Sequence, residues 1–84
     1  MARVKLTDYE QKKLVVRVTI KKRMELKRIR NPEVAKGLNI SLRTLCERWR
    51  YPEDFKLADL WSLTTILGLS DQEILQIVRG KENV

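Results

Sequence analysis

The 84-residue chain contains no histidine and a single cysteine, Cys46. Histidine is the commonest general base and the commonest metal ligand in proteins, so its absence removes both roles. One cysteine cannot form an internal disulfide, and it cannot build a zinc site of the usual cysteine and histidine type. The sequence therefore predicts a protein that is not an enzyme, binds no metal and uses no cofactor.

Glycine and long hydrophobic runs are also scarce. The three glycines, Gly37, Gly68 and Gly80, lie too far apart in the chain to form a loop that cradles a phosphate. No apolar run approaches the roughly 20 residues that span a bilayer. The first residues lack the apolar stretch of a signal peptide. We therefore expect a cytoplasmic protein with no membrane partner and no small-molecule substrate.

Positive charge, in contrast, is abundant. The chain has 18 Lys and Arg against 11 Asp and Glu, which gives a formal net charge of +7. Nine of the basic residues fall between positions 12 and 30, whereas the segment 53–84 has more acids than bases. This asymmetry favours a polyanionic partner for the N-terminal two thirds of the chain. A solvated basic surface that only keeps the protein soluble is the alternative.

The length suits one compact domain spanning residues 1–84. Capping signals and apolar spacing predict about five helices along it, and hence an all-α fold. Thr7 and Glu10 have the spacing of a capping box, which starts the first helix near residue 8. Residues 1–15 form an extension ahead of the core pattern, and their conformation as helix, strand or arm stays open.

The stretch 14–20 is rich in β-branched residues, which allows a strand as well as a helix. Val16, Ile20 and Met24 recur every four residues, however, as on one face of a helix. We therefore expect the first helix to continue through this stretch.

Two short helices are predicted next. Asn31 is expected to cap the first of them, with Pro32 at the first helical position and an end near Leu38. Ser41 is expected to cap the second, which runs to about Trp49. This pattern predicts a helix-turn-helix over about residues 31–49.

The turn between these helices has suitable residues. Asn39 tolerates the left-handed backbone conformation, and Ala35 is small where the second helix must cross. Ile40 and Leu45 are expected to point inward and hold the two helices together.

Two further helices complete the prediction. One covers about 56–67 and ends at Gly68; the other starts at a second capping box, Ser70 and Glu73, and ends at Gly80. The face of the 56–67 helix that we expect in the core carries Leu57, Leu60, Trp61, Thr64 and Leu67. Trp49 and Trp61 are accordingly interpreted as core residues and not as stacking platforms for single-stranded nucleic acid.

The run Val34–Leu45, VAKGLNISLRTL, resembles the helix-turn-helix of phage repressors of the lambda-repressor and Cro type. The segments 51–57 and 67–74 are similar to the closing helices of short prophage regulators, so the resemblance covers about residues 16–80. It implies a lambda-repressor-like bundle and a repressor-like transcriptional regulator of phage or mobile-element origin. The chain departs from the family at the turn, where Asn39 replaces the usual glycine. It also has Asn31-Pro32-Glu33 where the family places a polar contact to phosphate.

The resemblance further implies that the second helix of the motif lies in the major groove of double-stranded DNA. Arg43 is the first choice for specificity because an arginine can donate two hydrogen bonds to one guanine. The residues expected to face bases are Ser41, Leu42, Arg43, Cys46 and Arg48. The residues expected to contact phosphates are Lys36, Thr44, Arg50, Lys27, Arg28 and Arg30.

The last helix carries apolar residues on more than one side, and we expect Leu75 and Val78 to form a homodimer contact. A monomer with one exposed apolar side is the alternative. A different class of function also stays open, namely a protein-interaction or inhibitor module that reuses the fold. An RNA-binding protein is supported by charge alone. The sequence does not distinguish repressor, activator and recombination accessory factor, and it does not name the operator or the host.

Overall fold

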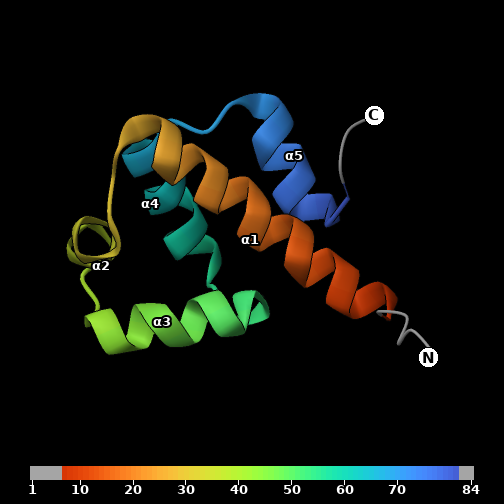
Figure 1. Cartoon of the computed structure of the whole chain (residues 1–84), viewed down its shortest axis with the longest axis horizontal. Coiled ribbons are helices and arrows are strands. Elements are labelled where there is room, and N and C mark those ends of the chain that lie inside the picture. Colours follow the sequence, from red (N-terminus) through yellow and green to blue (C-terminus); the bar gives the residue numbers. More distant parts are fainter. Residues whose placement is uncertain (1–6, 82–84) are drawn as a thin grey trace, which may run out of the picture.

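The computed structural model describes residues 7–81, which form five α-helices and one short 3-10 helix, with no strand in this range (Figure 1). The elements are α1 (Asp8–Lys27), α2 (Asn31–Leu38), α3 (Leu42–Arg50), η1 (Pro52–Asp54), α4 (Leu57–Leu67) and α5 (Asp71–Arg79). The predicted all-α bundle of about five helices is therefore confirmed. Residues 14–20 are helical, and of the extension 1–15 the part from residue 8 belongs to α1, whereas 1–6 lie outside the described residues.

Two capping boxes start helices where the sequence predicts them. The Thr7 hydroxyl accepts a hydrogen bond from the Glu10 N–H at 3.1 Å, and the Glu10 carboxylate accepts one from the Thr7 N–H at 3.2 Å. Ser70 and Glu73 repeat this exchange at the start of α5, at 3.2 and 2.9 Å. Each box satisfies backbone donors that a helix N-terminus leaves without a partner.

The start of α2 differs from the prediction. Its N-cap is Arg30, without a side-chain capping hydrogen bond, and Asn31 is the first helical residue. The Asn31 side chain instead accepts a hydrogen bond from Trp49 Nε1 at 3.1 Å. The predicted capping role of Asn31 was therefore wrong, because this amide pairs with a half-buried indole that needs an acceptor.

The core lies between α1, α2, α3 and α4. Helix α1 crosses the molecule, with α5 on one side and α2 and α3 on the other (Figure 1). The buried apolar side chains are Ile20, Val34, Ala35, Leu38, Leu45, Leu63 and Leu67. Val16 and Met24 pack against this cluster beside Ile20, which confirms the stripe predicted on α1.

The predicted inner face of α4 was partly wrong. Leu57 and Trp61 lie outside, with 62% and 65% of their surface exposed, so the core interpretation of Trp61 fails. Leu60 and Leu67 face the core as predicted, together with Leu63, which the prediction left out. Helix α4 is apolar on several sides, so more than one choice of face satisfied the helical period, and only packing against α1 and α2 decided between them.

Polar contacts hold α5 on α1. Both Arg23 and Glu73 are half-buried, and the Arg23 Nε donates to Glu73 Oε2 at 3.1 Å, while Nη2 donates to Oε1. Thr19 Oγ1 donates to Gln76 Oε1 at 3.3 Å, one turn earlier on α1 and one turn later on α5. The hydrogen bonds from Arg23 are the main cause that lowers the pKa of Glu73 below its usual 4.5.

This pairing predicts how acid affects stability. Because the pKa of Glu73 is lower in the folded than in the unfolded protein, its contribution is complete above pH 4.5 and is lost as the pH falls through the folded pKa. We expect Glu73→Gln to lower the free energy of unfolding at pH 7 by about 1 kcal/mol. Urea unfolding at pH 7 and at pH 3 measures how much of the free energy of unfolding is lost between the two pH values. This loss should be smaller in Glu73→Gln than in the wild type. Glu33→Gln, at an exposed position on α2, is the control; an equal loss in wild type and Glu73→Gln would contradict the prediction.

Candidate nucleic-acid interface

Helices α2 and α3 form a rigid unit joined by a three-residue turn. Asn39 has the left-handed conformation, with φ 59° and ψ 43°, as its residue type predicts. The N–H groups of Asn39 and Ile40 donate to carbonyls in the last turn of α2, at 3.1 and 3.0 Å. Ser41 then starts α3 by accepting a hydrogen bond from the Thr44 N–H at 3.1 Å. These local interactions fix the position of α3 relative to α2.

The inner side of the unit is apolar. Val34, Ala35 and Leu38 of α2 are buried, and Leu45 of α3 is completely enclosed. Trp49, one turn after Leu45, packs against the core and against Phe55, with ring centroids 5.6 Å apart. The side of α3 that faces away from these contacts is therefore free to meet a partner.

The outer face of α3 consists of the exposed residues Leu42, Arg43, Cys46, Glu47 and Arg50. Their spacing of one, four, five and eight places from Leu42 is that of a single helix face. The face contains three of the five residues predicted to contact bases. It also contains Glu47 and Arg50, of which Arg50 was assigned to phosphates from the sequence.

Two other predicted base contacts lie elsewhere. Arg48 is half-buried and on the flank of α3, next to Thr44 one turn earlier. The Ser41 hydroxyl is engaged as the helix cap and donates to Thr44 Oγ1 at 2.8 Å. Cys46 is exposed on the outer face.

The predicted phosphate contacts outside α3 fall into separate groups. Lys36 is exposed on α2, and Arg28 and Arg30 lie at the junction of α1 and α2. Lys27 lies against the turn after α4, where a β-carbon on Gly68 would be 3.4 Å from its Nζ. Lys27 is therefore not part of the same surface as Arg28 and Arg30.

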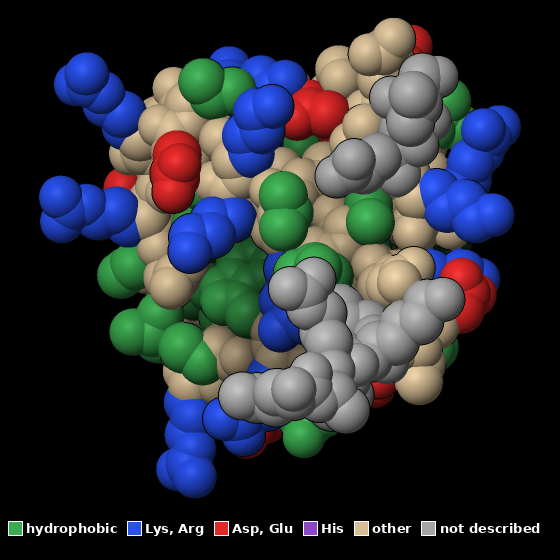
Figure 2. All heavy atoms as spheres, turned by 45° about the vertical axis from the view of Figure 1, so that its right-hand side comes forward, with side chains coloured by type: hydrophobic (Ala, Val, Ile, Leu, Met, Phe, Trp, Pro, Cys, Tyr) green, Lys and Arg blue, Asp and Glu red, His purple; other side chains and the backbone are tan. Residues whose placement is uncertain are grey.

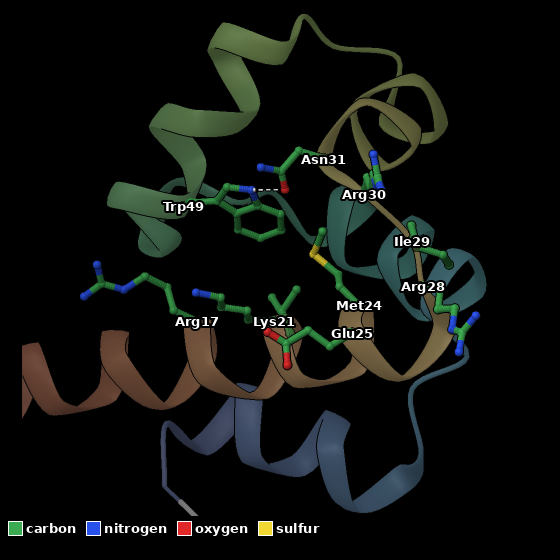
Figure 3. Close-up of a pocket in the computed structure, with 10 residues that line it drawn as sticks. Arg17, Lys21, Met24, Glu25, Arg28, Ile29, Arg30, Asn31 and Trp49 are labelled. Atoms are coloured by element: carbon green, nitrogen blue, oxygen red, sulfur yellow. Dashed lines mark hydrogen bonds between the residues drawn. The ribbon is translucent and has the colours of Figure 1, made fainter.

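A cleft of about 770 Å³ lies between α1 and the α2–α3 unit (Figure 3). Its apolar residues are Ile20, Met24, Ile29 and Trp49, and its charged residues are Arg17, Lys21, Glu25, Arg28 and Arg30; Asn31 completes the lining. In Figure 3 the Arg17 and Lys21 side chains extend from α1 on the side of the cleft where Trp49 lies. Hereafter we call this the α1–α3 cleft.

Sequence reasoning missed the α1–α3 cleft. The spacing of Arg17, Lys21 and Arg28 places these cations near one side of α1 and is the only local signal. The opposite wall depends on Trp49, 21 residues beyond Arg28, and only the tertiary fold brings it there.

The carboxylates near η1 have structural partners. Lys13 Nζ lies 3.5 Å from Glu53 and over the rings of Tyr9 and Tyr51, at 5.5 and 5.3 Å from their centroids. A hydrogen bond from its own backbone N–H, followed by those from Tyr9 and Lys13, lowers the pKa of Glu53. Asp59 accepts a hydrogen bond from the Lys56 N–H at 3.1 Å and starts α4. The contact between Lys13 and Glu53 holds η1 against α1, and Asp59 caps the start of α4. These carboxylates therefore have structural roles.

Cationic side chains dominate the charged surface. Figure 2 shows Lys and Arg side chains projecting around one face of the molecule, with fewer acidic side chains and with hydrophobic side chains between them. Within residues 7–81, no three His, Cys, Asp or Glu side chains gather in a group that could hold a metal ion. No helix in the same range is both long and apolar enough to cross a membrane.

Comparison with known protein families, curated proteins and solved structures finds no match to this chain.

Proposed function

We propose that this protein binds double-stranded DNA with α3 in the major groove and acts as a repressor-like transcriptional regulator. The observation that carries the proposal is the outer face of α3, which presents Arg43, Glu47 and Arg50 while Leu45 and Trp49 hold the helix from inside. An α-helix with its side chains is roughly 10–12 Å in diameter. The major groove is roughly 12 Å wide and admits such a helix.

The side chains of this face suit the edges of base pairs. Arg43, in the first turn of α3, can donate two hydrogen bonds to guanine, and Glu47 can accept one from the amino group of cytosine. Leu42 offers an apolar contact for the methyl group of thymine. Arg50 extends the face at the C-terminal end of α3, where a base or a phosphate is within reach of a long side chain.

Phosphate contacts would come from cations outside α3. Lys36 is exposed on α2, and Arg28 and Arg30 are exposed on the connection between α1 and α2. Such contacts add attraction that does not depend on base sequence and that weakens with salt. The formal charge of +7 strengthens this attraction over the whole molecule.

A symmetric dimer would let two copies of α3 read two half-sites. Leu75 is exposed on α5, and Val78 is 71% exposed one turn later. Val78 lines a shallow groove together with Ile77 and with Leu57 of α4, and Lys12 and Lys13 of α1 line the same groove. We therefore place the proposed dimer contact at Leu75 and Val78, with Leu57 at its edge.

The test is Arg43→Ala in a binding titration. Duplexes selected from a random pool on the wild-type protein supply the preferred sequence. We expect Arg43→Ala to weaken binding to that sequence by about 5- to 150-fold, the range of one good arginine–guanine contact. Binding to an unrelated duplex should change little.

Lys22→Ala is the matched control, because Lys22 is exposed on α1 and belongs neither to α3 nor to the α1–α3 cleft. It removes one positive charge, as Arg43→Ala does. If the two variants lose affinity equally, or if no sequence is enriched from the pool, base reading by α3 is rejected.

A second candidate function, a protein-interaction module, is favoured by the outer face of α4. Leu57 and Trp61 are more than half exposed there, and large exposed aromatic and aliphatic side chains are common at protein contacts. Such a module would keep its partner with Arg43→Ala and lose it with Trp61→Ala.

A further inference from the structure

The α1–α3 cleft has an apolar floor that DNA phosphates would not use. We propose that this cleft binds a small organic anion with an aromatic or short aliphatic body and one acidic group. Its volume of about 770 Å³ lies within the range of roughly 300–1,000 Å³ that is usual for small-molecule sites. The cleft combines cationic side chains at its border, an apolar floor and one aromatic ring in a fixed position.

The border of the cleft favours an anion. Four cationic side chains, Arg17, Lys21, Arg28 and Arg30, line the cleft, against a single carboxylate, Glu25. Arg17 and Lys21 lie one helical turn apart on α1, and Arg28 and Arg30 flank the connection to α2. A carboxylate, sulfonate or phosphate group of a ligand can therefore lie near cations at either end of the cleft and accept charge-assisted hydrogen bonds from them.

The floor favours an apolar body. Ile20 is almost completely buried beneath the cleft, and the half-buried Met24, Ile29 and Trp49 surround it. A simple inorganic ion would neutralise the border and leave this surface in contact with water. A ligand that also covers the floor removes that apolar surface from water, which is favourable.

The Trp49 ring is already held in place. Its Nε1 donates to Asn31 Oδ1 at 3.1 Å, shown as a dashed line in Figure 3, and its ring packs edge-on against Phe55. A wall that is fixed before binding loses little conformational freedom when a ligand arrives. The indole therefore offers a preformed aromatic surface for a flat ligand.

The cleft is bounded by α1, by the start of α2 and by α3, so its ligand would lie against the base of the α2–α3 unit. Arg28 and Arg30 would pair with the ligand and could not pair with phosphates at the same time. This consequence rests on the proposed function: ligand and DNA should compete.

The site is tested first without DNA, with 8-anilinonaphthalene-1-sulfonate as the probe. Trp61→Phe leaves Trp49 as the only tryptophan, since the chain has two. In this background we expect saturable binding that quenches Trp49 by energy transfer to the probe. Lys21→Gln should raise the Kd about fivefold, because it removes one of the lining charges.

The matched control is Lys22→Gln, the next residue on α1, which does not line the cleft. It should leave the Kd of the probe unchanged, with circular dichroism showing that both variants remain folded. Equal weakening by Lys21→Gln and Lys22→Gln, or binding without quenching of Trp49, would overturn the site. If the uncharged N-phenyl-1-naphthylamine binds equally tightly, the ligand does not need an acidic group. If millimolar inorganic phosphate displaces the probe, the ligand does not need an apolar body. Either result would overturn the proposal.

The competition is tested separately, with the selected duplex. We expect saturating probe to weaken DNA binding by wild type and to have a smaller effect on Lys21→Gln. Probe binding with unaffected DNA affinity would reject the competition and keep the site. Absence of DNA binding would reject the proposed function, whereas the titration without DNA would still decide the site.

Discussion

Leu45→Ala is expected to lower the free energy of unfolding by about 2–5 kcal/mol. The Leu45 side chain is completely enclosed, and it lies among buried residues that α1, α2 and α4 contribute to the same core. Truncation leaves a cavity that neighbouring side chains fill only in part. In a domain whose whole stability is of the order of 5–15 kcal/mol, such a loss populates the unfolded state. Chemical unfolding followed by circular dichroism measures it.

Leu42→Ala is the matched control for this prediction. It makes the same chemical change three residues earlier on α3, but Leu42 lies on the outer face and is 46% exposed. We expect a change of about 0.5 kcal/mol or less, as is usual for surface substitutions. Comparable destabilisation by both variants would mean that α3 is not oriented as described here.

Gly80→Ala is expected to lower the free energy of unfolding by about 2–4 kcal/mol. Gly80 ends α5 with φ +67°, a conformation that costs a residue with a side chain more than it costs glycine. A β-carbon there would also lie 2.7 Å from Lys12 Cβ and 3.2 Å from Lys12 Cα. The substitution therefore combines backbone strain with a collision between α5 and α1.

Gly68→Ala separates these two causes. Gly68 ends α4 with nearly the same φ of +62°, but a β-carbon there would meet only the end of the Lys27 side chain at ordinary contact distance. We expect a cost of about 1 kcal/mol from the backbone alone. Unfolding by urea should show a larger loss of free energy for Gly80→Ala than for Gly68→Ala. A larger loss for Gly68→Ala would show that α1 and α5 do not approach closely at Gly80.

Local interactions explain which parts of the fold are readable from the sequence. The caps at Thr7 and Ser70 and the left-handed Asn39 depend on residues within a few positions of one another, and each was predicted. The outer face of α3 follows from the helical period once Leu45 is assigned to the core. What this face binds stays a prediction.

Features that depend on distant packing were not readable. Trp61 is exposed because α4 uses another of its apolar sides. Asn31 pairs with Trp49, 18 residues away, and this partner outweighed its preference for capping. The α1–α3 cleft likewise requires α1 and the end of α3 to lie opposite each other, which no local pattern specifies.

The arrangement of α3 also has a consequence for how such a protein can evolve. Its inward residues, Leu45 and Trp49, serve stability, whereas the exposed residues Leu42, Arg43, Cys46, Glu47 and Arg50 make little contribution to the core. Substitutions on the outer face can therefore accumulate, singly or together, at little cost in folding. A duplicated copy of this gene would be able to change the chemistry of this face while inheriting an intact scaffold.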